Sequence, residues 1–255
     1  MRFKDKAVLV TGAGRGLGRA IALGFAQEGA AVAINAAHLS SAEEAAAIAR
    51  QLGGKVIAIQ ANVADEAEVN AMTERVISEL GGLDILVNNA GMSQPIMPTV
   101  EQSVEDWDRV MATNLRSAYL CSRAAGKWMV ERRSGKIVNI ASITGLTGQP
   151  MRTAYAPSKA AMLNLTKALA VEWGPYNINV NAVAPGYVLT ELIKHFIRQG
   201  RFSEEAMLKR TPLGHLSTPE DVAEATMFLA SEAAKNITGI HIAVDGGWSV
   251  NGWYM

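Results

Sequence analysis

Short apolar runs, many of them rich in β-branched residues, alternate with longer alanine-rich stretches along the whole chain. Continuous apolar runs of this kind are typical of strands that are buried on both faces of a parallel sheet. The pattern predicts strands at Ala7–Val10, Ala31–Ile34, Val56–Ile59, Ile85–Val87, Lys136–Ile140, Ile178–Val183 and Ile240–Val244.

The stretches between these runs predict helices at 17–29, 42–52, 66–80, 104–132, 153–173 and 219–230. Asp65 followed by Glu68 resembles a capping box, and Thr218 precedes a proline at a first helical position. Because strand and helix alternate along the whole chain, the order predicts an α/β fold of the Rossmann type. Such a fold has a doubly wound parallel sheet, here of about seven strands, with helices on both faces.

The chain contains no linker, repeat or low-complexity stretch, and we therefore expect a single domain over residues 1–255. The segment Tyr187–Ser217 breaks the alternation, because it predicts two short helices, near 190–199 and 203–209, and carries several lysines and arginines. Long insertions in compact domains are commonly mobile lids. We interpret residues 187–217 as a substrate lid, with a solvated cap as the alternative.

The composition indicates a globular protein, with 49% hydrophobic and 19% charged residues. Twenty-four basic residues balance twenty-four acidic ones, so the net charge creates no field that would attract nucleic acid or an anionic membrane. The first residues contain only a short apolar run, unlike a signal peptide or a membrane span. We expect a cytoplasmic protein that binds neither nucleic acid nor membranes.

Cys121 is the single cysteine, so no internal disulfide can form, and a reducing compartment is indicated. Its position in a helical pattern predicts a small, buried, apolar side chain. None of the four histidines pairs with a carboxylate or thiol at the spacing of metal ligands, and no metal site is expected. They are His38, His195, His215 and His241.

A glycine-rich loop joins the first strand to the first helix. Its glycines let the backbone turn tightly and approach a pyrophosphate, whose charge the helix N-terminus favours. The spacing G-x-G-x-x-G fails in every register, but Thr11, Gly12, Gly16 and Gly18 match T-G-x-x-x-G-x-G.

Further motifs follow in a fixed order: Asn88-Asn89-Ala90-Gly91 after the fourth strand, then Asn114, Ser142, Tyr155-x-x-x-Lys159, and Pro185-Gly186 with Thr190. Together with the glycine loop, this set resembles the short-chain dehydrogenase/reductase family over essentially the entire chain. Within that family the chain is similar to gluconate and polyol dehydrogenases and to 3-oxoacyl-carrier-protein reductases. The resemblance implies an NAD(P)-dependent enzyme that transfers a hydride between its cofactor and a secondary alcohol or ketone.

Reduction of a carbonyl needs a proton donor at the developing alkoxide, and the reverse reaction needs a base. Tyr155 and Lys159 lie four residues apart on a predicted helix, where a nearby ammonium lowers the pKa of a phenol. Ser142 follows the fifth strand and can donate a hydrogen bond to the substrate oxygen. The resemblance adds that Lys159 holds the nicotinamide ribose. It also implies that Asn114, placed at the start of the helix between the fourth and fifth strands, fixes a relay water through its carbonyl.

The resemblance also implies a set of cofactor-binding residues. For Asn88, Ala90 and Gly91, a role in stabilising the sheet and a role in binding the cofactor stay equally open. The full set is Gly12, Arg15, Gly16, Leu17, Gly18, Asn35, Ala36, Asn62, Val63, Asn88, Ala90, Gly91, Tyr155, Lys159, Pro185, Gly186, Val188 and Thr190.

The choice between the two nicotinamide cofactors depends on the end of the second strand, where NAD-binding folds place an acid on the ribose 2′-hydroxyl. Ala36 occupies that position, and no acid follows until Glu43. Arg15 is a cation within reach of a 2′-phosphate. Against this, Ala37 stands where many NADP-binding relatives carry arginine, and Asn62 replaces the aspartate that usually contacts adenine. We favour NADP(H), with NAD(H) as the alternative.

The candidate substrate-binding residues are Ser142, Arg152, Tyr155 and Tyr187. The lid segment ending Lys209-Arg210-Thr211-Pro212-Leu213-Gly214 resembles that of sugar-acid and polyol enzymes and is longer than is usual for carrier-protein reductases. The resemblance therefore favours a small polyol, sugar or sugar acid as substrate, and a 3-oxoacyl group on a carrier protein is the alternative. Arg152 either meets a substrate carboxylate or is a solvated surface cation. A non-catalytic nucleotide sensor is disfavoured, because the catalytic residues are all present.

Two sequence features indicate assembly. The helical stretches Ala118–Met129 and Ser158–Trp173 carry too few charges for fully hydrated outer faces. The chain also ends in an aromatic segment with Trp248, Trp253 and Tyr254. The resemblance implies pairing through the two helices and again through the last strand, which gives a homotetramer. We expect the C-terminal segment to pack against a neighbouring subunit, and a monomer is the alternative.

Overall fold

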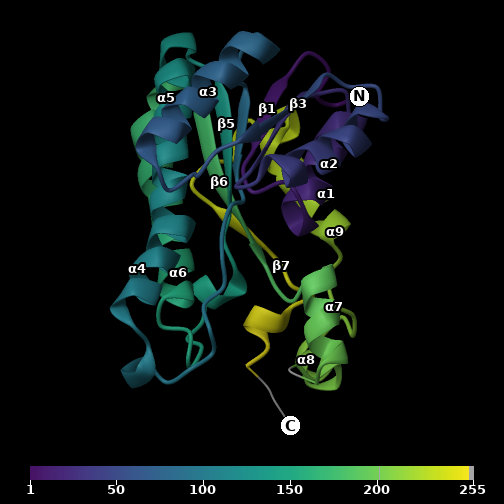
Figure 1. The fold of residues 1–255 in the computed structure, drawn as a ribbon, viewed down its shortest axis with the longest axis vertical. Coiled ribbons are helices and arrows are strands. Elements are labelled where there is room, and N and C mark those ends of the chain that lie inside the picture. The colour runs from purple at the N-terminus through teal and green to yellow at the C-terminus, as the bar shows by residue number, and fades with distance from the viewer. Residues whose placement is uncertain (201, 253–255) are drawn as a thin grey trace.

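The computed structural model describes residues 1–200 and 202–252, which form one parallel sheet in the order β3-β2-β1-β4-β5-β6-β7 (Figure 1). The sheet confirms the predicted Rossmann-type α/β fold. Chain order reverses between β1 and β4, and ligands of open α/β sheets bind at the carboxyl ends of the strands beside such a point. The strands are β1 (Ala7–Val10), β2 (Ala31–Ala36), β3 (Val56–Gln60), β4 (Ile85–Asn88), β5 (Gly135–Ile140), β6 (Ile178–Pro185) and β7 (His241–Val244).

Helices cover both faces of the sheet. The α-helices are α1 (Gly16–Gln27), α2 (Leu39–Arg50), α3 (Glu66–Leu80), α4 (Val104–Met111), α5 (Ser117–Arg132), α6 (Tyr155–Trp173), α7 (Glu191–Arg198), α8 (Glu204–Arg210) and α9 (Pro219–Ala230). Figure 1 shows α1, α2 and α9 on one face and α3, α5 and α6 on the other. Successive residues of a strand point to opposite faces, so Val8 and Val10 join one buried cluster and Leu9 joins the other.

The helix between β4 and β5 begins at Val104, where the Ser103 hydroxyl accepts a hydrogen bond from the Asp106 amide at 3.1 Å. Residues Ala112–Arg116 form a π-helical turn between α4 and α5. Asn114 therefore lies within this long helical run, and its expected place at the start of the helix was wrong. The reason is that Ser103, a favoured N-cap residue, begins the helix before Asn114.

The two helix starts expected from the sequence, at α3 and α9, differ in how many of their capping hydrogen bonds form. At α9, the side chains of Thr218 and Asp221 form the reciprocal bonds of a full capping box. At α3, Asp65 accepts from the Glu68 amide at 3.0 Å, but the Glu68 carboxylate accepts from the Asn62 amide at 2.8 Å instead. The capping box expected at α3 is therefore only half formed.

The segment 187–217 contains α7 and α8, close to the helical stretches expected there, and both lie at the lower end of the molecule in Figure 1. The short helical turn Trp248–Val250 lies at the same end. The rings of Tyr187 and Trp248 meet edge to face at 5.8 Å, and the Arg210 guanidinium lies 3.6 Å from the Trp248 ring centroid. Trp248 thus packs on residues of its own chain. The expectation that the C-terminal segment packs against a neighbouring subunit stays a prediction. The expected contacts of Trp253 and Tyr254 lie outside the described residues.

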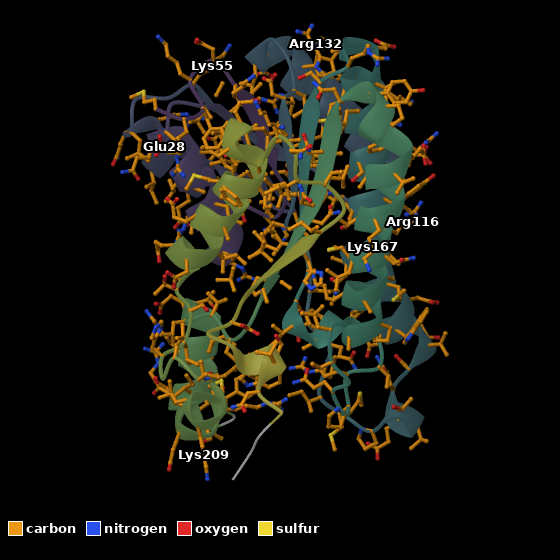
Figure 2. The ribbon with its side chains drawn as sticks, turned by 180° about the vertical axis from the view of Figure 1, so that it is seen from behind. Glu28, Lys55, Arg116, Arg132, Lys167 and Lys209 are labelled. Carbon is orange, nitrogen blue, oxygen red and sulfur yellow. The ribbon has the colours of Figure 1, made fainter. Side chains whose placement is uncertain are left out.

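Charged side chains cover the outside of the molecule; Figure 2 labels Glu28, Lys55, Arg116, Arg132, Lys167 and Lys209 among them. Cys121 is buried as expected, and burial raises the pKa of its thiol to about 12. Over the described part of the chain, no helix combines the length and the apolar character that a membrane crossing requires.

Candidate active site

The glycine loop forms a cradle that admits no side chains at its base. Gly12 and Gly16 adopt φ values of 61° and 56°, in the left-handed region that glycine tolerates. A Cβ on Gly18 would lie 2.3 Å from Nδ2 of Asn89 and 2.5 Å from the Gly12 carbonyl oxygen. The loop therefore packs directly on the segment after β4, and α1 begins at Gly16 with its amides at the cradle.

Two asparagines hold this cradle in place. The Asn35 side chain accepts from the Gly12 amide at 3.2 Å and donates to the Ala61 carbonyl at 3.1 Å, which ties the loop to β2 and β3. The Asn89 side chain donates to the Thr11 and Gly12 carbonyls at 2.8 and 3.0 Å. The side chain of Asn35 is thus occupied in fixing the loop.

The cradle fits the pyrophosphate of a dinucleotide, because a close backbone approach and a helix N-terminus are what such a group requires. At its far rim Ala36 ends β2, and Arg15 is exposed beside it in the loop. Asn62 is exposed next to buried Val63 at the end of β3. Leu17 follows Gly16 in the first turn of α1 and is half-buried.

Asn88 faces away from the cradle into the interior. Its amide donates to Ser122 Oγ at 2.9 Å and to Asn139 Oδ1 at 2.8 Å, and the residue is only 2% exposed. These contacts link β4, β5 and α5, which supports the structural role for Asn88. Ala90 and Gly91 follow in the loop, where a Cβ on Gly91 would lie 3.6 Å from the Lys159 nitrogen.

The end of β6 forms the other side of the cleft. Pro185 is the last residue of β6, and a Cβ on Gly186 would lie 2.8 Å from the Asp245 Cβ, so this turn packs tightly on the end of β7. Val188 is buried and pairs with Ser217. Thr190 caps α7 through its hydroxyl, which accepts from the Ile193 amide at 3.4 Å.

Tyr155 and Ser142 approach each other at the carboxyl edge of the sheet, close enough for the Ser142 side chain to lower the pKa of the Tyr155 phenol. Tyr155 opens α6, and Ser142 follows β5. A Cβ on Gly145 would lie 2.7 Å from the carbonyl carbon of Lys159, so the loop carrying Ser142 rests directly on the α6 backbone. The two hydroxyls are therefore held together by backbone packing.

The pKa of the Tyr155 phenol is raised by burial, which outweighs the lowering effects of the Ser142 hydrogen bond and the Arg152 charge. This direction is opposite to the lowering expected from Lys159. The Lys159 nitrogen lies 5.9 Å from the centroid of the Tyr155 ring. Tyr155 therefore keeps its proton at neutral pH.

Lys159 is 4% exposed, and its ammonium donates to the Ile140 carbonyl at 2.7 Å. Burial lowers its pKa to about 8, because a dry environment penalises the charged form. The ammonium lies at the junction of β5, α6 and the Gly91 loop.

Asn114 is fully buried and connects this loop to α6. Its Oδ1 accepts from the Met92 amide at 2.7 Å, and its Nδ2 donates to the Met92 carbonyl at 3.0 Å and to Ser158 Oγ at 3.1 Å. It lies in the π-helical turn, a feature that interrupts the regular hydrogen-bond ladder and is frequent at functional sites. The structure thus brings Asn114, Ser142, Tyr155 and Lys159 into one region.

Gln94 was not identified from the sequence. Its side-chain oxygen accepts from the amides of Ala154 and Tyr155 at 2.8 and 2.6 Å, and so caps the start of α6 from a distant loop. The available signal was indirect, because Ala154 stands where a serine, threonine, aspartate or asparagine would cap the helix locally. Gln94 thus helps to position Tyr155.

Arg152 and Tyr187 approach the same cleft from opposite sides. Arg152 donates to Ser93 Oγ at 2.6 Å and to the Gln94 carbonyl at 3.2 Å, and its guanidinium lies 5.9 Å from the Tyr155 ring centroid. Tyr187 leads from β6 into the segment 187–217. Over the described residues, no group of three histidine, cysteine or carboxylate side chains is arranged to hold a metal ion.

Residues 12–249 match the protein family described as enoyl-(acyl carrier protein) reductase. Over 245 residues the chain is 42% identical to the 3-oxoacyl-[acyl-carrier-protein] reductase FabG of Staphylococcus aureus (strain Mu50), covering 95% of this chain and 97% of the relative. It is 40% identical over 247 residues to the cis-4-hydroxycyclohexanecarboxylate dehydrogenase of Sinomonas cyclohexanicum, covering 97% and 98%.

Two solved structures with bound cofactors are similar over nearly their whole length. A 7α-hydroxysteroid dehydrogenase complexed with NADH and 7-oxo glycochenodeoxycholic acid superposes with a TM-score of 0.91 at 35% identity, covering 96% of this chain and 95% of its own. ElxO with NADP bound superposes with a TM-score of 0.91 at 36% identity, covering 95% and 98%.

The buried ammonium generates a prediction about stability. Replacing Lys159 with methionine should raise the free energy of unfolding of the cofactor-free protein at pH 7 by about 2 kcal/mol. Removing the buried charge contributes roughly 3 kcal/mol, and the unpaired Ile140 carbonyl costs about 1 kcal/mol. Between pH 8 and 10.5 the unfolded wild type holds a proton that the folded state has released, so wild-type stability rises with pH in this window.

The advantage of Lys159→Met should therefore shrink as the pH increases from 8 to 10.5. Urea unfolding of both proteins at pH 7 and pH 10, at equal protein concentration, measures this. A variant that is less stable at pH 7, or a difference that stays the same at both pH values, would contradict the prediction.

Proposed function

The chain belongs to the short-chain dehydrogenase/reductase family and is an NAD(P)-dependent oxidoreductase acting on CH–OH groups, and we propose that Tyr155, Ser142 and Lys159 carry its proton chemistry. The observation that carries this proposal is the proximity of the Ser142 and Tyr155 side chains at the carboxyl end of β5, with the Lys159 ammonium beside them. The bound nicotinamide supplies or accepts the hydride.

In reduction, the Tyr155 hydroxyl donates its proton to the substrate oxygen, and in oxidation the phenolate takes it back. The Ser142 hydroxyl orients the same oxygen. Lys159 stabilises the phenolate by its charge and holds the ribose hydroxyls of the cofactor. Asn114 supports a proton relay from Lys159 through its backbone carbonyl, since it lies in the π-helical turn next to the ammonium.

We propose NADP(H) as the preferred cofactor. Ala36 places no carboxylate at the end of β2, and the next acids are engaged elsewhere: Glu43 with Arg50 at 3.0 Å and Glu44 with Arg19 at 3.1 Å. The exposed Arg15 side chain has no ion pair within the described residues and remains available to a 2′-phosphate.

For the substrate, we propose a small secondary alcohol or ketone with polar groups, such as a polyol, sugar or sugar acid. Arg152 beside Tyr155 supports this, and the relative named for a hydroxycyclohexanecarboxylate is consistent with it. The second candidate is a 3-oxoacyl group on a carrier protein, which the FabG relative favours. Residues 187–217 act as the lid in either case, since this segment follows the end of β6 directly, and α7 and α8 lie at the lower end of the molecule in Figure 1.

Absorbance of the reduced nicotinamide tests this function directly. Both cofactors are offered with polyols, sugar acids, simple ketones and a 3-oxoacyl thioester. Turnover of any ketone supports the oxidoreductase assignment, and a preference of at least tenfold in kcat/KM for the thioester would select the second candidate.

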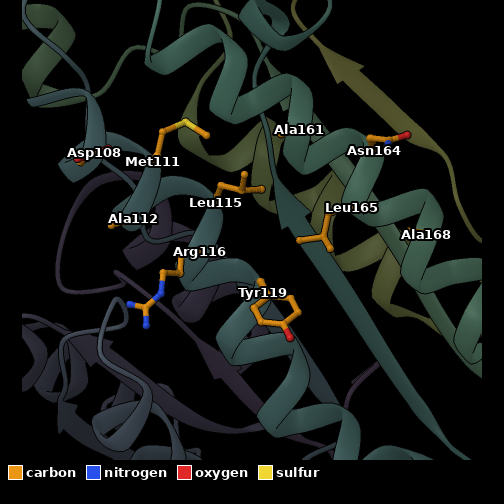
Figure 3. A pocket seen from close by; sticks show the side chains of 10 residues that line it. All are labelled: Asp108, Met111, Ala112, Leu115, Arg116, Tyr119, Ala161, Asn164, Leu165 and Ala168. Atoms are coloured by element: carbon orange, nitrogen blue, oxygen red, sulfur yellow. The ribbon is translucent and has the colours of Figure 1, made fainter. Parts of the chain in front are cut away.

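We also propose a cytoplasmic homotetramer; the single buried thiol of Cys121 fits a reducing compartment. A groove of about 670 Å³ runs between the π-helical turn with α5 and the outer face of α6 (Figure 3). Leu115 and Leu165 point toward each other across it, and Tyr119 at its edge is 49% exposed. Because β7 is an edge strand with an unpaired side, a second pairing surface lies there.

Replacing Tyr155 with phenylalanine removes the proton donor and leaves the cofactor cradle intact. Turnover should fall by about 10³-fold, while the Kd for reduced cofactor stays within about threefold. Stopped-flow and fluorescence titration measure the two quantities, and Tyr176→Phe, on the surface after α6, is the matched control. More than a few per cent of residual turnover would rule out the assignment of Tyr155.

Replacing Ala36 with aspartate should shift cofactor preference toward NAD(H) by at least about tenfold. The new carboxylate repels a 2′-phosphate and can accept a hydrogen bond from a 2′-hydroxyl. The ratio of kcat/KM values for the two cofactors, in wild type and variant, measures the shift. A wild type that already prefers NAD(H) tenfold would refute the NADP(H) proposal.

Sedimentation equilibrium tests the assembly. Wild type should sediment at about four times the chain mass of 27.2 kDa. Ala168→Glu places a charge in the groove and should reduce the assembly to dimers, whereas Ala47→Glu, on the exposed side of α2, should leave tetramers. A wild type that sediments as a single 27.2 kDa species would eliminate the tetramer.

A further inference from the structure

One cation beside Tyr155 neither donates nor accepts the transferred proton. Arg152 lies three residues before Tyr155, in the turn that leads into α6, and is half-buried. Its guanidinium lies 5.9 Å from the Tyr155 ring centroid. A guanidinium this close to the Tyr155 ring can reach an anionic group of a substrate whose oxygen lies at the Tyr155 hydroxyl.

The guanidinium is held in place by neutral groups. Ser93 Oγ and the Gln94 carbonyl accept from one and the same nitrogen, Nη1, at 2.6 and 3.2 Å. The acceptors belong to a segment that is itself fixed, because the buried Gln94 side chain caps α6. The other guanidinium nitrogens have no protein acceptor within the described residues.

No carboxylate neutralises this charge. Within the described residues Arg152 forms no ion pair, and the groups that act on its charge are the phenols of Tyr155 and Tyr187. Burial lowers the pKa of the guanidinium, as desolvation of a cation requires. Asp245, at the end of β7, directs its two oxygens to the amides of Gly247 and Ser249 at 2.9 and 2.8 Å.

A half-buried arginine without an acid is unfavourable unless a ligand supplies the negative charge. We propose that Arg152 is a specificity-determining residue that binds a carboxylate of the substrate, so that the enzyme acts on oxo acids and hydroxy acids whose carboxylate lies a few bonds from the reacting carbon. This inference rests on the proposed function. It restricts the substrate class, because a neutral thioester offers Arg152 no anion.

The competing interpretation is that Arg152 only anchors the 93–94 segment or lowers the pKa of Tyr155. Either role would affect every substrate alike. A carboxylate-binding role affects charged substrates alone, so paired substrates that differ only in charge separate the two interpretations.

The substrates are unbranched 2-, 3-, 4- and 5-oxo acids and their methyl esters, which vary the distance from carbonyl to carboxylate stepwise. The proteins are wild type, Arg152→Gln, Arg152→Lys and the control Arg75→Gln. The control removes the same charge from α3, where Arg75 pairs with Glu79 at 2.6 Å. For each pair kcat/KM is measured with the preferred cofactor, and the thermal midpoint and cofactor Kd verify folding.

Wild type should prefer the acid over its ester by at least about tenfold at one or more chain lengths, because hydrogen bonds to charged groups are the strong ones. Arg152→Gln should lower kcat/KM for that acid about 30-fold and change the ester less than about threefold. Arg152→Lys should restore part of the loss, and Arg75→Gln should match wild type.

Equal wild-type rates for acids and esters, or equal losses on both in Arg152→Gln, would overturn the proposal. If neither series turns over but other ketones do, butanoate and butanamide serve as dead-end inhibitors. Inhibition by butanoate alone that disappears in Arg152→Gln supports the proposal, and its absence refutes it. Failure of every ketone with both cofactors would instead refute the proposed function itself.

Discussion

The buried ammonium of Lys159 is the constraint on which the arrangement of the cleft depends. A charge in a dry interior must be paired with polar groups, and here the Ile140 carbonyl at the end of β5 serves this purpose. That contact places α6 against the carboxyl edge of the sheet, and the contact of Gly145 with the α6 backbone brings Ser142 to Tyr155. The Lys159 ammonium, which lowers the stability of the folded chain, therefore determines where the hydroxyls of Ser142 and Tyr155 lie together.

The carboxyl edge of the sheet also joins the half of the fold formed by β1 to β3 to the half formed by β4 to β7. Thr11 and Asn89 connect the glycine loop to the segment after β4, and Asn114 connects that segment to α6. The glycine loop and the start of α6 are thus linked by hydrogen bonds in which side chains bind backbone groups and, at Asn114 and Ser158, each other. A rigid link of this kind preserves the geometry that hydride transfer requires.

Features determined by local pattern could be predicted from the sequence. Strands β1 to β6 are mainly buried, so their apolar runs identified them, and the ordered motifs placed Ser142, Tyr155 and Lys159 on the correct elements. Features determined by contacts between distant segments could not. Gln94 caps a helix sixty positions along the chain, and Trp248 packs against Arg210 of the segment 187–217; neither contact leaves a local signal in the sequence.

The upward shift of the Tyr155 pKa bears on the direction of the proposed reaction. A phenol whose pKa is raised by burial holds its proton until negative charge develops on the substrate oxygen, which suits reduction. Oxidation needs the phenolate, and the cations Lys159 and Arg152 are the groups that would stabilise it. An anionic substrate bound to Arg152 would neutralise one of them and hold the phenol still more firmly in its protonated form. On the proposed roles, the Arg152 charge that selects the substrate therefore also adjusts the pKa of Tyr155, the proposed acid.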